Sequence, residues 1–478
     1  MKHTCPLQTK RCGGCPQLEK DYAAQLKTKQ IYLEKLLGRY GSVQPIRGME
    51  NPWHYRNKVI STFAPGRGGK LVSGIYAAGS HKVLPVEQCL LQDEILDKVV
   101  DAVRAAANRC RYIAYNEDHG TGLLRHVLCR RGFATGQVMV VLVTGQALLP
   151  GAKNFVKALL EEAKKRQVPV TTVVQNYNPR QTSAVLGTQE KTLYGKGYIL
   201  DTLCGHTYAI SPRSFYQVNP VQTEVLYGLA VQAAHLTGKE TVLDAYCGIG
   251  TIGLTAAPHA KTVVGVERNR EAVQDAIGNA KHNGITNAKF YAADATQWIV
   301  DAADKGQTAD VIFMDPPREG STEAFLQAVA KMGPARLVYV SCGPDSLARD
   351  LAQITALGYR VESIQPVDMF PHTEHIETVV LLSKGEIDSK KVKVEISMED
   401  VDLSDFQKGA TYPQIKEYVL NQTGLKVSSL YISQIKRKCG LEVGQSYNKP
   451  KSENAKQPQC PPEKEKAIMD ALKHFGVI

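Results

Sequence analysis

The sequence predicts an α/β protein built on a mostly parallel sheet, with an α+β region before it and a small helical extension after it. Short apolar runs alternate with helix-like segments between residues 241 and 382, which is typical of a parallel sheet. Several of these runs end in glycine-rich, acidic or thiol-bearing loops. Because the carboxyl ends of parallel strands meet at one edge of a sheet, these loops are expected to form a single site.

The first expected strand, Thr241–Ala245, leads into a glycine-rich turn and a helix. Gly248, Gly250 and Gly253 have the spacing G-x-G-x-x-G, which lets a backbone approach a ligand closely. The second strand ends at Glu267, where a carboxylate can accept hydrogen bonds from ribose hydroxyls. Since a dinucleotide-dependent dehydrogenase would show much the same spacing, this pattern alone does not choose between nucleotide cofactors.

The later expected strands carry side chains that a dehydrogenase fingerprint lacks. A third strand leads to Asp294, and a fourth ends in the loop Asp315-Pro-Pro-Arg318, where two prolines fix the chain. The fifth, Arg336–Val340, is followed by Cys342, a possible nucleophile if a neighbour lowers its pKa. Two closing strands are expected over Tyr359–Asp368 and Ile376–Leu382.

Taken together, these motifs resemble the RNA uracil-5-methyltransferase family. The resemblance covers roughly the first four-fifths of the chain, and it rests on Gln217-Val-Asn219, Tyr246–Gly253, Glu267, Asp315–Arg318, Ser341–Pro344 and His375-Ile-Glu377 in this order. It implies a Rossmann-like methyltransferase domain with a mostly parallel seven-stranded sheet, which uses S-adenosylmethionine and acts on RNA.

The resemblance also implies a chemistry. Carbon 5 of uracil is a poor nucleophile, so a thiolate adds to carbon 6, carbon 5 attacks the sulfonium methyl, and a base removes the proton at carbon 5. The implied thiolate is Cys342 and the implied base is Glu377. The implied cofactor-binding residues are Gln217, Tyr246, Gly248, Gly250, Thr251, Glu267, Asp294 and Asp315.

The sequence allows two interpretations for some of the nearby side chains. Arg318 could hold the uracil environment or a phosphate, or be a surface cation beside a turn. Asp294 could approach the adenine or cap the next helix. Cys247 is expected to pack, and His372 and His375 are expected to form loop hydrogen bonds rather than to act as catalysts.

Clustered cysteines near the start of the chain predict an inorganic centre. Cys5, Cys12 and Cys15 lie close together in sequence, and Cys89 supplies a distant fourth thiol. Spacing alone allows a structural zinc ion or a four-iron four-sulfur cluster. The family resemblance implies the four-iron four-sulfur (4Fe-4S) cluster, because many members carry one on such a pattern.

Composition favours an intracellular protein with a polyanionic partner. The formal net charge is +11 for 478 residues, with a pI near 9.0, which favours encounter with RNA. Eleven cysteines without an apolar leader favour a reducing cytoplasm over a disulfide framework. No apolar run is long enough to span a bilayer, and a monomer is expected.

We expect three regions: 1–200, an iron-sulfur and RNA-binding α+β region; 201–385, the methyltransferase domain; and 386–478, a basic helical extension. In the first region, Asn51–Lys58 interleaves aromatic rings with cations, a mixture that stacks on unpaired bases and neutralises phosphates. Trp53 and Tyr55 could equally be core residues. A helix is expected within Gln17–Leu37, strands at Val59–Phe63, Lys70–Ala77, Leu123–Arg131 and Gln137–Val143, and a helix at Leu91–Arg109.

The extension has charged or Lys/Pro/Gln-rich connectors over Glu386–Val394 and Asn448–Pro462. Helices are expected over Tyr412–Leu420, Ser428–Lys438 and Glu463–Phe475, and they could grip RNA or be a solvated tail.

The function that the sequence predicts is methylation of carbon 5 of a uridine in 23S ribosomal RNA, through a covalent cysteine–uracil adduct. The same reaction on transfer RNA is the alternative within this chemistry. A non-catalytic RNA-binding protein that keeps the fold is the alternative from another class.

Overall fold

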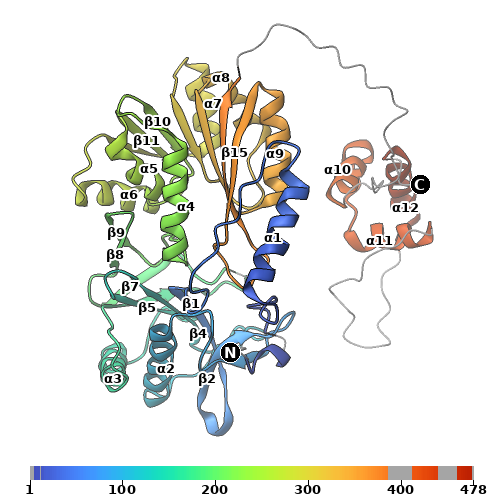
Figure 1. Ribbon diagram of the computed structural model, residues 1–478. Coiled ribbons are helices and arrows are strands. Elements are labelled where there is room, and N and C mark those ends of the chain that lie inside the picture. The colour runs from blue at the N-terminus through green and yellow to red at the C-terminus, as the bar shows by residue number, and fades with distance from the viewer. Residues whose placement is uncertain (1–4, 11, 183, 386–411, 440–459, 476–478) are drawn as a thin grey trace. The chain divides into compact units, whose positions relative to one another are not determined.

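The computed structural model describes residues 5–10, 12–182, 184–385, 412–439 and 460–475. The chain divides into two compact units, Met1–Ile387 and Asp388–Ile478. The first unit contains two seven-stranded sheets and a two-stranded hairpin, and the second consists, in its described part, of three helices (Figure 1). The connectors expected over Glu386–Val394 and most of Asn448–Pro462 lie outside the described residues.

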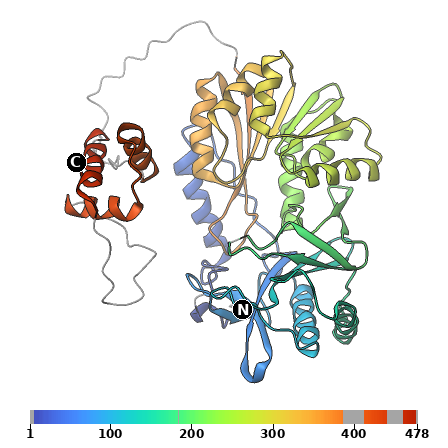
Figure 2. The ribbon, with the colours of Figure 1, turned by 180° about the vertical axis from the view of Figure 1, so that it is seen from behind.

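The first sheet has the strand order β3-β2-β1-β4-β5-β6-β7. All its pairs are antiparallel except β5 with β6. Two helices, α2 (Glu94–Arg109) and α3 (Ala152–Lys165), pack on one face and lie side by side in Figures 1 and 2. The strands are β1 (Lys58–Pro65), β2 (Leu71–Tyr76), β3 (Val83–Pro85), β4 (Leu124–Arg131), β5 (Val138–Thr144), β6 (Thr172–Tyr177) and β7 (Gln189–Tyr194).

The second sheet has the order β12-β11-β10-β13-β14-β16-β15. Its first five strands are parallel, whereas β16 runs antiparallel to both β14 and β15, so the sheet is mixed. The expected seven strands are all present. They are β10 (Thr241–Ala245), β11 (Thr262–Glu267), β12 (Ala288–Ala292), β13 (Val311–Met314), β14 (Arg336–Ser341), β15 (Tyr359–Val367) and β16 (Glu377–Lys384).

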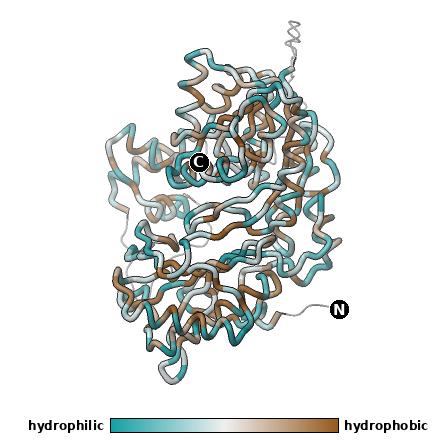
Figure 3. The backbone as a smooth tube through the Cα atoms, turned by 90° about the vertical axis from the view of Figure 1, so that its left-hand side faces the viewer, coloured by the Kyte–Doolittle hydropathy of each residue, from teal (hydrophilic) through white to brown (hydrophobic). Residues whose placement is uncertain are grey.

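Helices cover both faces of the second sheet because its strands are apolar on both sides. One core contains residues of α4 (Pro220–Ala233), α5 (Thr251–Ala256) and α6 (Arg270–His282). The other contains residues of α1 (Tyr22–Leu37), α7 (Ala295–Asp304), α8 (Glu323–Met332) and α9 (Pro344–Ala356). In β10, for example, Val242 belongs to the first core and Leu243 to the second. Figure 3 shows hydrophobic stretches recurring through the interior of the unit.

The strand order reverses between β10 and β13, since the chain builds β10, β11 and β12 outward and then returns to β13 on the other side. In open α/β sheets, ligands bind outside the carboxyl ends of the strands at this point. The hairpin of β8 (Ile199–Leu203) and β9 (His206–Ile210) shares a core with both sheets. The expected helix within Gln17–Leu37 starts only at Tyr22, because Asp21 caps it by accepting the backbone N–H of Ala23.

Three helices form the described part of the second unit: α10 (Tyr412–Thr423), α11 (Ser429–Lys438) and α12 (Pro462–His474). They agree with the helices expected from the sequence to within a few residues. Their shared core is small and aliphatic, and includes Ile415, Val419, Ile432, Ile468 and Leu472. None of the helices in the described residues combines the length and the hydrophobicity that a membrane span requires.

Candidate active site at the carboxyl edge of the second sheet

Cys342 lies one residue beyond the carboxyl end of β14, in a loop that is fastened to the Asp315–Arg318 loop. The hydroxyl of Ser346 donates a hydrogen bond of 2.8 Å to the carbonyl oxygen of Arg318. A side chain at Gly343 would meet that same carbonyl oxygen at 2.7 Å, so only glycine permits this approach. The thiol and the acidic loop are therefore parts of one structural feature.

Glu377 begins β16, the antiparallel neighbour of β14. Ser341 of β14 pairs with Thr378 of the antiparallel strand β16. Cys342 follows Ser341 and Glu377 precedes Thr378, so these two residues lie close together at the same sheet edge. The Glu377 side chain is buried, with only 3% of the residue exposed. Burial raises its pKa well above the usual range for a glutamate, and the nearby Asp315 adds to this rise.

The thiol and the carboxyl groups oppose one another's ionisation. The pKa of Cys342 is raised to about 11, mainly by burial and then by the charges of Glu377 and Asp315, while the charge of Arg318 acts to lower it. Burial also raises the pKa of Asp315 to about 7. These four side chains, which the sequence singles out from three separate loops, therefore lie within electrostatic reach of each other. Arg318 is the cation that favours the reactive thiolate.

Glu267, at the end of β11, is bound by the backbone of the glycine-rich turn. Its Oε2 accepts the N–H of Gly248 at 3.2 Å, and its Oε1 accepts the N–H of Asn269 at 2.7 Å. Each carboxylate oxygen can accept a further bond, so ribose hydroxyls could still bind. Gly250 has φ 84° at the start of α5, a conformation that favours glycine. The turn and the carboxylate thus have the arrangement that a nucleoside-containing cofactor requires.

The other residues that are expected to bind the cofactor differ in their hydrogen-bond partners. Gln217 is 8% exposed as a residue, and its carboxamide makes no hydrogen bond to another described residue. Thr251 donates a bond of 3.3 Å to the Tyr227 hydroxyl. Asp294 caps α7, because its Oδ1 accepts the N–H groups of Thr296 and Gln297. Capping was one of its two interpretations, and it leaves Oδ2 without a role in the cap.

Tyr246 has φ 66°, an uncommon backbone conformation for a residue other than glycine. Its ring packs against Phe325 of α8, with the centroids 5.4 Å apart. Beside it, Cys247 is buried as expected for a packing residue.

The loop that precedes Glu377 is held by the N-terminal part of the chain. Gln25 of α1 accepts the backbone N–H of His372 at 3.0 Å and also contacts its Nδ1 at 3.0 Å. The Trp53 ring stacks on the His372 ring at a centroid distance of 4.0 Å, and the Tyr55 hydroxyl donates to the Pro371 carbonyl. His372 is thus a structural residue, and Trp53 and Tyr55 help to pack the loop.

The four cysteines Cys5, Cys12, Cys15 and Cys89 are free and half-buried. The pKa of Cys15 is raised to about 12 by burial and then by the other three thiols, which therefore lie within electrostatic reach of it. Nevertheless, among the described residues, no three or more His, Cys, Asp or Glu side chains are arranged to hold a metal ion. The sequence prediction that these thiols belong together agrees with their influence on the pKa of Cys15.

Two features near the site were not predicted from the sequence. Phe215, two residues before Gln217, exposes 64% of its surface, as an aromatic ring available for stacking would. Its signal was an aromatic residue beside a recognised motif. The other is the pairing of Arg130 with Lys58, which adds a third cation to the predicted RNA-binding segment Asn51–Lys58 and is described below.

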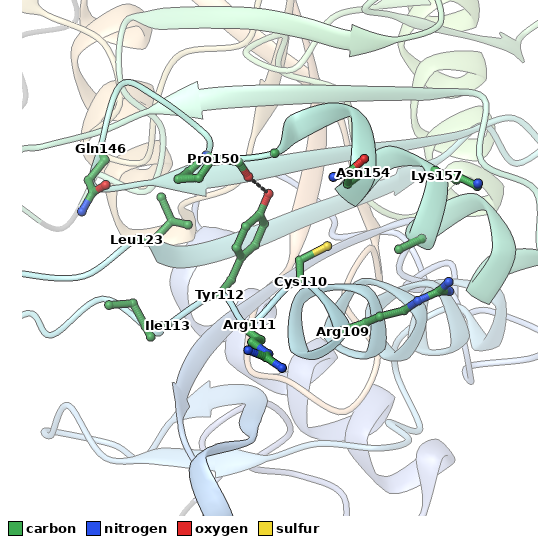
Figure 4. Close-up of a pocket in the computed structure, with 12 residues that line it drawn as sticks. Arg109, Cys110, Arg111, Tyr112, Ile113, Leu123, Gln146, Pro150, Asn154 and Lys157 are labelled. Atoms are coloured by element: carbon green, nitrogen blue, oxygen red, sulfur yellow. Dashed lines mark hydrogen bonds between the residues drawn. The ribbon is translucent and has the colours of Figure 1, made fainter.

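A cavity of about 720 Å³ lies elsewhere, between the end of α2 and the start of α3. Figure 4 shows Arg109, Arg111 and Lys157 at this cavity, and the Tyr112 hydroxyl donating to the Pro150 carbonyl. It contains none of the residues of the sheet edge.

The chain is similar to several known proteins. A family model described as tRNA (uracil-5-)-methyltransferase matches residues 186–385. An uncharacterised RNA methyltransferase of Bacillus cereus is 44% identical over 387 residues, which are 80% of this chain and 83% of the relative. One of Halalkalibacterium halodurans is 45% identical over 383 residues, covering 79% and 82%.

Among solved structures, the Pyrococcus abyssi tRNA (uracil-54, C5)-methyltransferase in complex with S-adenosyl-L-homocysteine is similar, with a TM-score of 0.63 and 25% identity. The match covers 80% of this chain and 87% of that one.

Proposed function

This chain belongs to the RNA uracil-5-methyltransferase family, and from that premise we propose that it methylates carbon 5 of one uridine in 23S ribosomal RNA through a covalent cysteine–uracil adduct. The protein is an S-adenosylmethionine-dependent RNA methyltransferase. The observation that carries the covalent mechanism is the meeting of Cys342 and Glu377 at adjoining ends of β14 and β16, beside Asp315 and Arg318.

Cys342 is the proposed nucleophile, whose sulfur bonds to carbon 6 of the uracil. The resting thiol is a weak acid, since its pKa is raised to about 11. The guanidinium of Arg318 opposes that rise, and it is the nearby protein cation that favours the thiolate. Arg318 is exposed, as a surface cation would be, and we propose that its charge also acts on the thiol in the reaction.

Glu377 is the proposed base, which takes the proton from carbon 5 so that the thiolate can leave. A raised pKa makes the ionised carboxylate a stronger base, and Glu377 must be ionised when it accepts the proton. Burial, the main cause of that rise, also keeps bulk water from supplying competing protons.

S-adenosylmethionine, when bound, supplies an electrophilic methyl group on a cationic sulfur. We propose that Glu267 binds its ribose and that Gly248, Gly250 and Thr251 line its path along the turn. Gln217, Tyr246, Asp294 and Asp315 complete the proposed binding set. The support is that the Gln217 carboxamide lacks a partner among the described residues and that Asp294 keeps one oxygen free of its cap.

We also propose that Cys5, Cys12, Cys15 and Cys89 hold a 4Fe-4S cluster. A single zinc ion needs four sulfurs at about 2.3 Å from one centre, whereas a cluster offers each cysteine a separate iron atom. The support for a shared site is that Cys12, Cys89 and Cys5 all raise the pKa of Cys15. The role of the cluster would be structural, because methyl transfer needs no electron from the protein.

Ribosomal RNA is the proposed substrate, and transfer RNA is the second candidate, since the family model and the Pyrococcus abyssi relative are both described as acting on tRNA. The deciding measurement is mass spectrometry of nucleosides, with mapped positions, in host RNA with and without this protein. Loss of one 5-methyluridine in 23S RNA supports the proposal. Loss in tRNA instead selects the second candidate, and no change in any 5-methyluridine refutes both.

The three-region division remains a proposal. Regions 1–200 and 201–385 each contain one of the large sheets, although both lie within the same compact unit. We propose that the first region and the basic helices of the second unit contribute RNA contacts beyond the target uridine. The last turn of α11, Lys436-Arg437-Lys438, supports the latter.

A further inference from the structure

Three cations gather at the point where the first sheet faces the methyltransferase region. Lys58 begins β1 and pairs across the sheet with Arg130 of β4. Side chains of directly paired residues emerge on the same face of a sheet. Arg56 precedes them in the chain, and both Arg56 and Arg130 act electrostatically on the Lys58 ammonium. Lys58, Arg56 and Arg130 are called the Lys58 cluster below.

This cluster faces the active-site side of the sheet rather than helices α2 and α3. Ile60, two residues after Lys58 and so on the same face of β1, packs against the core that contains Tyr216 and Met369. Arg130 reaches the same region, because its Nη1 donates to the carbonyl oxygen of Ser214 at 3.0 Å. Ser214 directly precedes the exposed ring of Phe215.

The cluster also lies close to the reacting residues. The backbone N–H of Asn57 donates to the carbonyl of Val218, between the motif residues Gln217 and Asn219. Arg56 and Arg318 both act electrostatically on His375, two residues before Glu377. These contacts bring the Lys58 cluster close to the segment that carries Phe215 and to the loop before Glu377.

None of the three cations has a carboxylate partner within the described part of the chain. Lys58 and Arg56 make no side-chain hydrogen bond or ion pair there, although both are half-buried. Arg130 is almost fully buried, yet only carbonyl oxygens accept its hydrogen bonds, and its Nε has no partner. Gathering like charges away from water is costly unless an anion compensates them.

We propose that the Lys58 cluster is a binding site for a backbone phosphate of the RNA substrate, next to the nucleotide that enters the active site. The inference rests on the proposed function, since it takes RNA to be the substrate. Lys58 contacts the phosphate through its ammonium group, which acts as a point charge. Arg130 donates to the Ser211 and Ser214 carbonyls, which hold its guanidinium as a fixed positive charge beside the phosphate. A phosphate bound here would hold the strand beside Phe215.

The test is equilibrium binding of a fluorescein-labelled oligouridylate to the full-length protein, over a series of salt concentrations, for wild type and Lys58→Gln. The matched control is Lys261→Gln, because Lys261 is exposed and precedes β11 at the opposite edge of the second sheet. Lys58→Gln should weaken binding by about 10-fold and reduce the steepness of the salt dependence by about one phosphate contact. Lys261→Gln should match wild type.

Affinity for S-adenosylmethionine is measured in parallel, and it should be unchanged in both variants. Equal RNA affinity and equal salt dependence of wild type and Lys58→Gln would overturn the proposal. So would weakened S-adenosylmethionine binding with normal RNA binding, because the cluster would then serve the cofactor's carboxylate. If Lys58→Gln fails to fold, Arg56→Gln takes its place with the same expected direction.

The results that would refute the proposed function differ from those that would refute the phosphate site. Wild type that binds the oligouridylate in a Lys58-dependent way, but leaves host uridines unmethylated, would refute the uridine methylation and keep the phosphate site. Wild type that methylates host RNA, with Lys58→Gln equal to it in binding and in rate, would keep the function and refute the site.

Discussion

The ammonium of Lys29 lies 2.6 Å from Oδ1 of Asp368, and only 2% and 0% of the two side chains is exposed. Lys29 belongs to α1, and Asp368 directly follows β15. The same ammonium donates to the carbonyl of His375 at 3.1 Å, while the other Asp368 oxygen accepts the Tyr22 hydroxyl at 2.8 Å. This buried pair ties both ends of the loop that leads to Glu377.

Lys29→Met should therefore destabilise the protein by about 3–5 kcal/mol, because it leaves the Asp368 carboxylate buried without its cation. Chemical denaturation followed by circular dichroism measures the change. The double variant Lys29→Met/Asp368→Asn should recover much of the loss, since no buried charge remains. A single variant as stable as wild type would mean that the pair contributes nothing to the fold.

Cys342→Ser should abolish methyl transfer, whereas Glu377→Gln should stop the reaction later. Without a base the proton at carbon 5 stays in place, so the protein–RNA adduct should accumulate in Glu377→Gln as a band that survives denaturing electrophoresis. Turnover should fall by at least about 100-fold. Absence of any adduct in the glutamine variant, with wild-type turnover, would remove Glu377 from the mechanism.

Arg318→Gln should slow methylation by making the thiolate scarcer. Arg318 lowers the pKa of Cys342, so its removal raises that pKa further above about 11. At every pH below the pKa, the thiolate fraction then falls about tenfold for each unit of rise. Single-turnover rates from about pH 6 to 9 should increase with pH in both proteins, with the variant below wild type throughout. Arg318→Lys should restore part of the rate, and a variant profile that overlies wild type would contradict this role.

Cys12→Ala should impair folding rather than chemistry alone, because its thiol is assigned to a structural cluster. Iron and acid-labile sulfide per chain should drop, and the unfolding midpoint should fall with them. Cys110→Ala is the control, as Cys110 is a half-buried free thiol whose pKa is influenced by burial and Arg109 rather than by the four cysteines. A Cys12→Ala protein with normal iron content and normal stability would contradict the assignment.

Truncation after Lys384 should weaken RNA binding while leaving the first unit folded, since the helices of the second unit form their own core. The expected loss is several-fold at low salt and smaller at high salt, because the removed contacts are electrostatic. Anisotropy with labelled RNA measures it, and circular dichroism verifies folding. Unchanged affinity at low salt would show that the extension does not hold RNA.

The strands that carry the site could be predicted because each is an apolar run that ends in a turn. The strand expected at Arg336–Val340 is β14 with one residue added, Ser341. Strand β7 was missed because its residues, Gln189–Tyr194, are mostly exposed and polar, so they show no apolar alternation. Strands β3 and β6, the hairpin β8–β9 and helices α3 and α4 were also missed.

Long-range contacts account for what the sequence could not predict at the site. The motifs indicated that Cys342, Glu377, Asp315 and Glu267 belong to one edge, since parallel strands dictate it. Nothing local, however, indicates that Lys29 pairs with a carboxylate 339 residues away. Likewise, Lys58 and Arg130 become neighbours only through strand pairing.

The contact between α1 and the loop before Glu377 also bears on how the protein is made. On the ribosome, Lys29 and the apolar residues Leu33 and Leu37 emerge long before the strands that bury them. The face of α1 that is buried in the folded protein therefore stays exposed until almost the whole first unit has been translated. The loop before the proposed base is completed in that last step, so newly made chains should acquire activity only after the first unit is released whole.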